Sequence, residues 1–220
     1  LSGLRHTDAE IVRSLIQPWL AGRPNLFRLP AADIERALDT LPAVAHSEVR
    51  VSLPRRVDVV LAERTPVFVW RTAEGDYLVD ATGVLLDSAA ALEPGSTLPV
   101  FRDDRRRSAP AEVGQRLDGV DLEAVLKLGA LTPALLGSDA RRLQLAADDD
   151  EGYAIIAEPH GWRAVFGHYT PTLRPPEIIE RQVQCLRALL ADEAQLQTVY
   201  LSPADDRCGT FVTRPTPLEP

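Results

Sequence analysis

The sequence contains no methionine, a single lysine and only two cysteines among its 220 residues. Without a methionine the chain has no initiator, and it opens at Leu1 in the middle of a pattern, so we expect a segment of a longer protein. No apolar run approaches the roughly 18–20 residues that span a bilayer, and no signal-peptide pattern stands at the start. We therefore expect any membrane anchor to precede Leu1.

The chain also lacks an excess of basic residues. Its formal net charge is -8 at pH 7, which argues against a general nucleic-acid binder, because such proteins carry a basic face. Hydrophobic residues make up 45% and charged residues 25% of the chain, and these proportions are ordinary for a folded protein. The composition predicts one large folded domain or two small ones, each with its own core.

The two cysteines, Cys185 and Cys208, are too few for a disulfide framework or a structural zinc site. We expect Cys185 on an amphipathic helix and Cys208 in a polar turn. Two free thiols are the preferred interpretation, and a single bridge is the alternative.

Sequence motifs for catalysis are missing. There is no G-x-S-x-G elbow, no H-E-x-x-H and no glycine-rich phosphate loop. The acidic run at 148–151 lacks the alternate ligands and the glycine of a calcium loop, and it predicts the tip of a hairpin. The histidines are scattered, and we expect each to be solvated or locally bonded: His6, His46, His160 and His168. The sequence thus predicts no catalytic residue, no metal site and no cofactor.

Three consecutive arginines lie in a charged stretch that runs from Asp103 to Ser108. They could meet anionic lipid or a cell-wall polymer. The neighbouring Asp103 and Asp104 reduce the local net charge to about +1, so we expect an ordinary exposed loop.

The first 64 residues predict a β-α-α-β-β module. Thr7 and Glu10 form a capping box ahead of the first helix, and a second helix is expected between Pro30 and Pro42. Apolar residues then alternate with polar ones over 49–53 and 57–61, which indicates two strands. Two helices on one face of a small sheet form an α+β module.

From Thr65 onward the pattern changes to short strands and turns. The expected elements are a hairpin over 77–86, a helix over 121–136, a strand near 143–145, a hairpin over 153–166, a helix over 177–191 and two strands at 199–201 and 209–212.

Several short motifs fall in the order and spacing of a POTRA domain of the FtsQ/DivIB type. They are Ser2-Gly3, Asn25-Leu26-Phe27-Arg28-Leu29, Leu41-Pro42-Ala43-Val44, Val51-Ser52-Leu53-Pro54 and Glu63-Arg64-Thr65-Pro66-Val67. The hairpin that follows, over 77–84, is also similar to that family. The chain resembles the FtsQ/DivIB family of bacterial cell-division proteins over nearly its whole length, most specifically through residue 86.

The resemblance implies a fold and a cellular role. The fold is α+β, with a POTRA domain at 1–65, a mostly antiparallel β domain with two helices at 66–214 and a frayed Pro-rich tail at 215–220. It implies a single-pass protein of the cell membrane, with a transmembrane helix ahead of Leu1 and this segment extracytoplasmic at the division septum. It further implies a non-enzymatic scaffold whose partners are small coiled-coil membrane proteins of the FtsB/DivIC and FtsL types.

The resemblance also implies that a partner is captured by strand addition at the last strand. The expected partner-binding residues are Gly209, Thr210, Phe211, Val212 and Thr213, with Val199 and Leu201 on the neighbouring strand. Alternation leaves open whether Phe211 meets a partner or the core. The alternative functions are a POTRA-type chaperone or docking module of an outer-membrane insertion or secretion system, and an enzyme of unrecognised type.

Overall fold

The computed structural model describes residues 1–4, 7–21, 25–54, 56–91, 97–107, 109–159, 161–203 and 207–214. The chain divides into two compact units. The first comprises Leu1–Val67, Tyr77–Ser96 and Glu112–Arg116, and the second comprises Phe68–Asp76, Thr97–Ala111 and Leu117–Pro220. No helix within the described ranges is long and apolar enough to cross a membrane.

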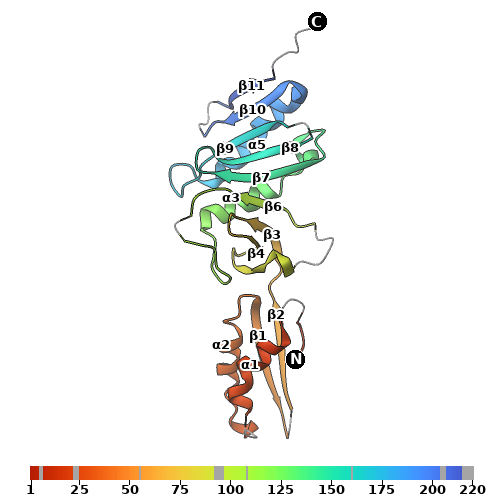
Figure 1. The fold of residues 1–220 in the computed structure, drawn as a ribbon, viewed down its shortest axis with the longest axis vertical. Coiled ribbons are helices and arrows are strands. Elements are labelled where there is room, and N and C mark those ends of the chain that lie inside the picture. The colour runs from red at the N-terminus through yellow and green to blue at the C-terminus, as the bar shows by residue number, and fades with distance from the viewer. Residues whose placement is uncertain are drawn as a thin grey trace. The chain divides into compact units, whose positions relative to one another are not determined.

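The first unit is built on two helices beside a β-hairpin (Figure 1). Its elements are α1 (Ala9–Leu20), the 3₁₀ turn η1 (Leu26–Arg28), α2 (Ala31–Leu38), β1 (Val44–Ser52) and β2 (Arg56–Glu63). The apolar faces of all four longer elements meet in one core, made of Val12, Ile16, Ile34, Leu38, Val44, Val49, Val59 and Leu61. Burial of this apolar surface is the main source of stability for such a module.

The first strand of the expected β-α-α-β-β order is a single bridge between Ser2 and Val60. The Ser2 amide donates to the Val59 carbonyl at 3.1 Å, and the Ser2 carbonyl accepts from the Leu61 amide at 3.0 Å. Gly3 has a φ of +89°, and a Cβ there would lie 1.8 Å from the Leu61 carbonyl oxygen. A glycine is therefore required where the chain leaves the edge of β2.

The predicted capping box at Thr7 is wrong. Asp8 is the N-cap of α1, and its carboxylate accepts from the Glu10 amide at 2.8 Å. The Thr7 amide instead donates to the Glu63 carboxylate at 2.8 Å, which ties the entry of α1 to the end of β2. An aspartate is as good an N-cap as a threonine. The contact between Thr7 and Glu63 holds Thr7 outside the helix, so Asp8 becomes the N-cap.

The first unit also holds part of the hairpin formed by β4 (Asp76–Asp80) and β5 (Leu85–Ser88), with the turn η2 (Ala89–Ala91) after it. Arg64, at the end of β2, donates to the Asp80 carboxylate at 2.8 Å and to the Val44 carbonyl at 3.2 Å. Asp80 is 4% exposed. Its burial raises the pKa, but hydrogen bonds from Arg64, Val84 and Thr82 outweigh this and hold the Asp80 pKa below its ordinary value.

The second unit carries most of a large, mostly antiparallel sheet. The remaining elements are β3 (Pro66–Arg71), β6 (Val100–Asp103), α3 (Gly119–Gly129), α4 (Pro133–Leu136), β7 (Arg142–Asp148), β8 (Gly152–Glu158), β9 (Arg163–Gly167), η3 (Pro176–Ile178), α5 (Ile179–Leu189), η4 (Leu190–Gln195), β10 (Leu196–Leu201) and β11 (Gly209–Thr213). The strand order is β11-β10-β9-β8-β7-β6-β3-β4-β5. The predicted α+β fold is confirmed.

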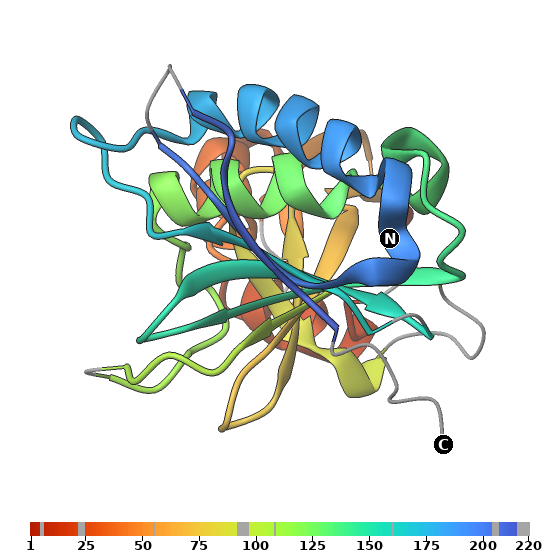
Figure 2. The same cartoon turned by 90° about the horizontal axis from the view of Figure 1, so that it is seen from above.

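The two longer helices of the second unit lie in the crossover connections that its parallel strand pairs require. β6 and β7 pair in parallel, as do β9 and β10, and a parallel pair needs a crossover connection. The crossover between β6 and β7 contains α3 and α4, and the one between β9 and β10 contains α5. Figure 2 shows α3 in green and α5 in blue lying side by side over one face of the sheet.

The single helix expected over 121–136 is interrupted. α3 ends at Gly129, and Thr132 then caps α4 by accepting from the Leu135 amide at 3.2 Å. Pro133 takes the first position of α4, where its missing amide proton costs nothing. The proline disfavours a helical conformation at the residue before it, so the helical spacing of apolar residues continues while the helix does not.

The prediction of an exposed loop at 103–108 is wrong for Asp103, which is buried, and for Arg105 and Arg107, which are half-buried. Ser108 lies outside the described part of the chain. Asp103 is 2% exposed. Its carboxylate accepts from the Trp70 indole at 3.1 Å and from the Arg105 guanidinium at 2.7 Å. Arg105 also donates to Asp121 at 2.9 Å, and the Arg107 guanidinium lies 4.2 Å from the centre of the Trp70 ring.

Candidate partner-binding edge

β11 is the last strand in the order of the large sheet, and its neighbour is β10. The two pair antiparallel, with Leu201 opposite Gly209, Tyr200 opposite Thr210 and Val199 opposite Phe211. All five residues of β11 are exposed. The strand therefore forms an edge of the sheet (Figure 1).

The two faces of β11 differ in what lies beside them. Phe211 is paired with Val199, which is 0% exposed, so the two side chains share the inward face of β10. Val212 is paired with Thr198 on the opposite face. Phe211 is nevertheless 53% exposed and Val212 49% exposed, so the edge offers apolar surface on both faces.

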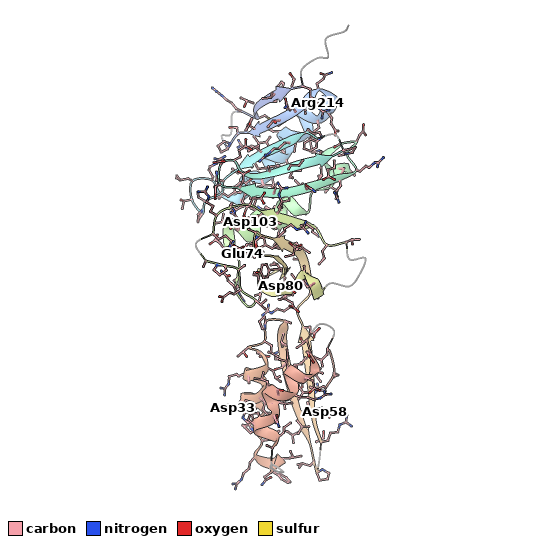
Figure 3. The ribbon with its side chains drawn as sticks, in the orientation of Figure 1. Asp33, Asp58, Glu74, Asp80, Asp103 and Arg214 are labelled. Atoms are coloured by element: carbon pink, nitrogen blue, oxygen red, sulfur yellow. A yellow bond between two sulfur atoms is a disulfide. The ribbon has the colours of Figure 1, made fainter. Side chains whose placement is uncertain are left out.

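The direction of the β11 amides follows from the contacts at its two ends. The Cys208 carbonyl accepts from the Ser202 amide at 3.1 Å, and the Arg214 amide donates to the Gln195 carbonyl at 2.8 Å; Arg214 is labelled in Figure 3. Backbone groups alternate in direction along an antiparallel strand. Thr210 therefore turns its amide toward β10, and the amides of Gly209, Phe211 and Thr213 point to the open edge.

Val199 and Leu201 do not belong to the exposed surface. They are 0% and 5% exposed, because their side chains point to the inward face of β10. Tyr200 lies between them, is 41% exposed and donates to the Glu151 carboxylate at 3.2 Å. The same alternation that predicts inward positions for Val199 and Leu201 indicates an outward Tyr200, and sequence reasoning missed this residue.

The preferred prediction of two free thiols is wrong, because Cys185 and Cys208 form a disulfide with a Cα–Cα distance of 5.2 Å. Cys185 belongs to α5, and Cys208 immediately precedes β11. The return of the chain to the sheet edge brings together two residues 23 positions apart. The spacing alone carries no signal of that return, since it depends on where β11 pairs.

Two of the four histidines that the sequence predicts to be solvated or locally bonded lie in the described part of the chain. His46 and His168 are exposed, while His6 and His160 fall outside the described residues. Within the described ranges, no three side chains of histidine, cysteine, aspartate or glutamate gather as metal ligands would. The acidic turn at 148–151 joins β7 to β8 as predicted, and the Asp148 carboxylate accepts from the Glu151 amide at 2.7 Å and from Arg163 at 3.0 Å.

Comparison with known proteins points in one direction. Residues 1–64 match the family model of the FtsQ-type POTRA domain. The cell-division protein FtsQ of Chloroflexus aurantiacus is 31% identical over 166 residues, which are 76% of this chain and 56% of that protein. FtsQ of Chloroflexus aggregans is 30% identical over 78% of this chain and 59% of its own length. The chain belongs to the FtsQ/DivIB family of cell-division proteins.

A third FtsQ, from Neisseria meningitidis, is 35% identical over 48% of this chain and 42% of its own length. The chain therefore spans less than two thirds of each of these FtsQ relatives. The POTRA match ends at Arg64, the residue whose guanidinium bonds Asp80 in the following hairpin.

Proposed function

We propose that this chain is a non-enzymatic scaffold of the bacterial division machinery that binds partner proteins by strand addition to β11. It acts outside the cytoplasm at the septum, as part of a single-pass membrane protein. Its partners are small coiled-coil membrane proteins of the FtsB/DivIC and FtsL types. Membership of the FtsQ/DivIB family supports the division role, and the edge supports the mechanism.

The observation that carries the mechanism is the unprotected character of β11. Soluble proteins usually guard an edge strand with lysine, proline, a bulge or a covering segment, because unpaired amides and carbonyls otherwise recruit a further strand. β11 reads Gly-Thr-Phe-Val-Thr, with no charged residue and no proline, and all its residues are exposed. The register irregularity of its pairing with β10 falls on β10, between Leu196 and Thr198. Such an edge is suited to β-augmentation, in which main-chain hydrogen bonds supply affinity and side chains supply specificity.

The proposal is tested by removing one outward amide without changing the exposed side chain by much. Thr213→Pro removes the outward donor at the end of β11, and proline is tolerated on an edge strand where the amide faces solvent. Loss of one hydrogen bond should weaken partner binding by about 1 kcal/mol, roughly fivefold. The matched control Thr213→Ala removes the same hydroxyl and keeps the amide, so it should bind as the wild type does.

Binding is measured by calorimetry with the extracytoplasmic segment of the FtsB/DivIC-type protein from the same bacterium, beside a thermal melt of each variant. Equal binding by Thr213→Pro and Thr213→Ala, with both proteins folded, would remove strand addition at β11 from the proposal. Val212→Pro serves as a second reference, since its amide faces β10 and its loss should disturb the free protein as well.

A further inference from the structure

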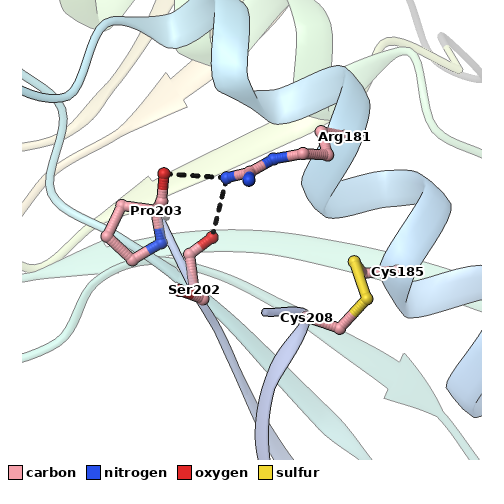
Figure 4. The surroundings of a disulfide bond; sticks show 5 residues. All are labelled: Arg181, Cys185, Ser202, Pro203 and Cys208. Carbon is pink, nitrogen blue, oxygen red and sulfur yellow. Dashed lines mark hydrogen bonds between the residues drawn. A yellow bond between two sulfur atoms is a disulfide. The ribbon is translucent and has the colours of Figure 1, made fainter. Parts of the chain in front are cut away.

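The connection between β10 and β11 is attached to α5 at two points. Cys185 bonds Cys208, which immediately precedes β11. Arg181, one helical turn earlier on α5, donates to the carbonyls of Pro203 at 2.7 Å and Ser202 at 3.4 Å. Residues four apart lie on the same face of a helix, so the guanidinium and the disulfide reach the connection from one side of α5 (Figure 4).

Apart from this attachment, β11 is held by its pairing with β10. Each of its five residues is exposed, so apolar burial contributes little to its order, and β10 is its neighbour in the sheet. Short edge strands of this kind open with a small free-energy cost relative to core strands. The attachment to α5 therefore holds an edge strand that would otherwise open at a small free-energy cost.

At its start, β11 passes close to the backbone of β10. Gly209 has a φ of +127°, and a Cβ at this position would lie 1.9 Å from the Tyr200 carbonyl oxygen. The chain thus passes from the disulfide directly into close contact with β10. At the other end, the Arg214 guanidinium donates to the Leu196 carbonyl at 3.1 Å. The strand is held at both ends while its outer edge stays open.

We propose that the Cys185–Cys208 disulfide, assisted by Arg181, is a latch that keeps β11 extended and ready to accept a partner strand. Cys185, Cys208 and Arg181 are positioning residues in this view, since none of them lies on the open edge. A pre-ordered strand loses less conformational freedom when a partner docks, so it binds more tightly. This inference rests on the proposed strand addition and adds the residues that set its affinity.

The alternative is that the disulfide stabilises the whole fold by restricting the unfolded chain. Hydrogen exchange separates the two roles without any partner. In the double variant Cys185→Ser, Cys208→Ser, we expect the inward amides of Thr210, Val212 and Arg214 to exchange about tenfold faster or more, while amides of β7 and β8 keep their rates. Gln184→Ser, at an exposed neighbouring position of α5, is the matched control and should change neither set.

Unchanged exchange of the inward amides of Thr210, Val212 and Arg214 in the double variant would overturn the latch. Equal acceleration across β7, β8 and β11 would also overturn it, because that pattern is the mark of a global stabiliser. Arg181→Gln provides an independent check: it should accelerate exchange of the same inward amides to a smaller extent, since the disulfide remains.

Binding links the latch to function. If opening leaves one tenth of the molecules with β11 in the docking form, the apparent Kd rises about tenfold, because it equals the intrinsic Kd divided by the competent fraction. The probe is the FtsB/DivIC-type segment used above, titrated into wild-type protein and the double variant. An unchanged Kd despite faster exchange at β11 would overturn the positioning role. If the wild-type protein itself does not bind this segment, the strand-addition proposal fails, and the exchange result alone decides the latch.

Discussion

Phe211 is the largest side chain of β11, and the structure leaves it 53% exposed on the inward face of the sheet. We expect Phe211→Asp to leave the melting temperature nearly unchanged, because the carboxylate can remain in water in the free protein. Partner binding should fall by about 2 kcal/mol or more, since a buried charge at an interface must be desolvated.

The control for Phe211→Asp is Leu135→Asp, which adds the same charge at another exposed apolar position of the second unit, 56% exposed in α4. It should bind the FtsB/DivIC-type segment as the wild type does. A collapsed melt for Phe211→Asp would instead assign this side chain to the core of the domain.

Arg105 forms ion pairs with two carboxylates in the interior of the second unit and so offsets their negative charge. Its side chain is 21% exposed and pairs with Asp103, whose side chain is 0% exposed, and with Asp121. Burial alone would lower the pKa of Arg105, but its hydrogen bonds to these carboxylates raise it, so the guanidinium stays charged. Arg105→Met should cost about 3–5 kcal/mol, the penalty of removing one partner of a buried ion pair, because the remaining cation beside Asp103, the Arg107 guanidinium, lies farther away at 3.7 Å.

Urea unfolding measures this loss, and Arg102→Met is its matched control. Arg102 lies on β6, three residues before Arg105, and pairs with Asp104, but both side chains are about half exposed, at 48% and 54%. Surface pairs contribute about 0–1 kcal/mol. A similar small effect for both variants would mean that the cluster around Asp103 is solvated.

The same cluster makes stability depend on pH. Burial raises the pKa of Asp121, but bonds from Arg105 and from the Tyr153 hydroxyl, at 2.6 Å, lower it further than burial raises it. With the folded pKa depressed, the unfolded chain binds more protons in acid. The stabilisation is therefore present above the unfolded pKa of about 3.9 and is lost as the pH falls through the folded pKa. Asp121→Asn should flatten the acid limb of a plot of unfolding free energy against pH; an unaltered slope would contradict the assignment.

At the scale of elements, periodicity predicted the helices and strands whose position depends on residues close together in the sequence. The helix expected over 177–191 contains α5, and the hairpin expected over 153–166 is β8 and β9. Alternation likewise identified β1 and β2, since their apolar residues alone decide which face is buried. These elements follow from local spacing, which a sequence displays directly.

What periodicity could not predict depends on contacts between distant elements. A string of aspartates and arginines at 103–107 is typical of a solvated loop, and only the indole of Trp70 and the carboxylate of Asp121 make it an interior network. The disulfide depends on the return of β11 to α5. The position of β11 at the sheet edge is a matter of strand order, and only the family resemblance indicated it.

The whole chain is expected to be modular, with residues 1–65 folding without the rest. Every residue of the first core, from Val12 to Leu61, lies within that segment, so its apolar burial is complete in the fragment. We expect a cooperative thermal transition by circular dichroism. A disordered spectrum would show that the POTRA segment needs the hairpin of β4 and β5.

Arg64 allows the coupling between that segment and the hairpin to be measured. In the whole chain its guanidinium pairs with Asp80, the two side chains being 22% and 6% exposed, so Arg64→Met should destabilise the first unit by about 1–3 kcal/mol through the loss of a charged hydrogen bond to a buried carboxylate. In the fragment 1–65 Asp80 is absent, and the same substitution should change stability by only about 0.5 kcal/mol, as surface substitutions usually do. The difference between the two effects, taken from urea unfolding of four proteins, is the coupling energy of the Arg64–Asp80 contact. Equal effects in fragment and whole chain would mean that Arg64 acts only through the Val44 carbonyl, which both proteins retain.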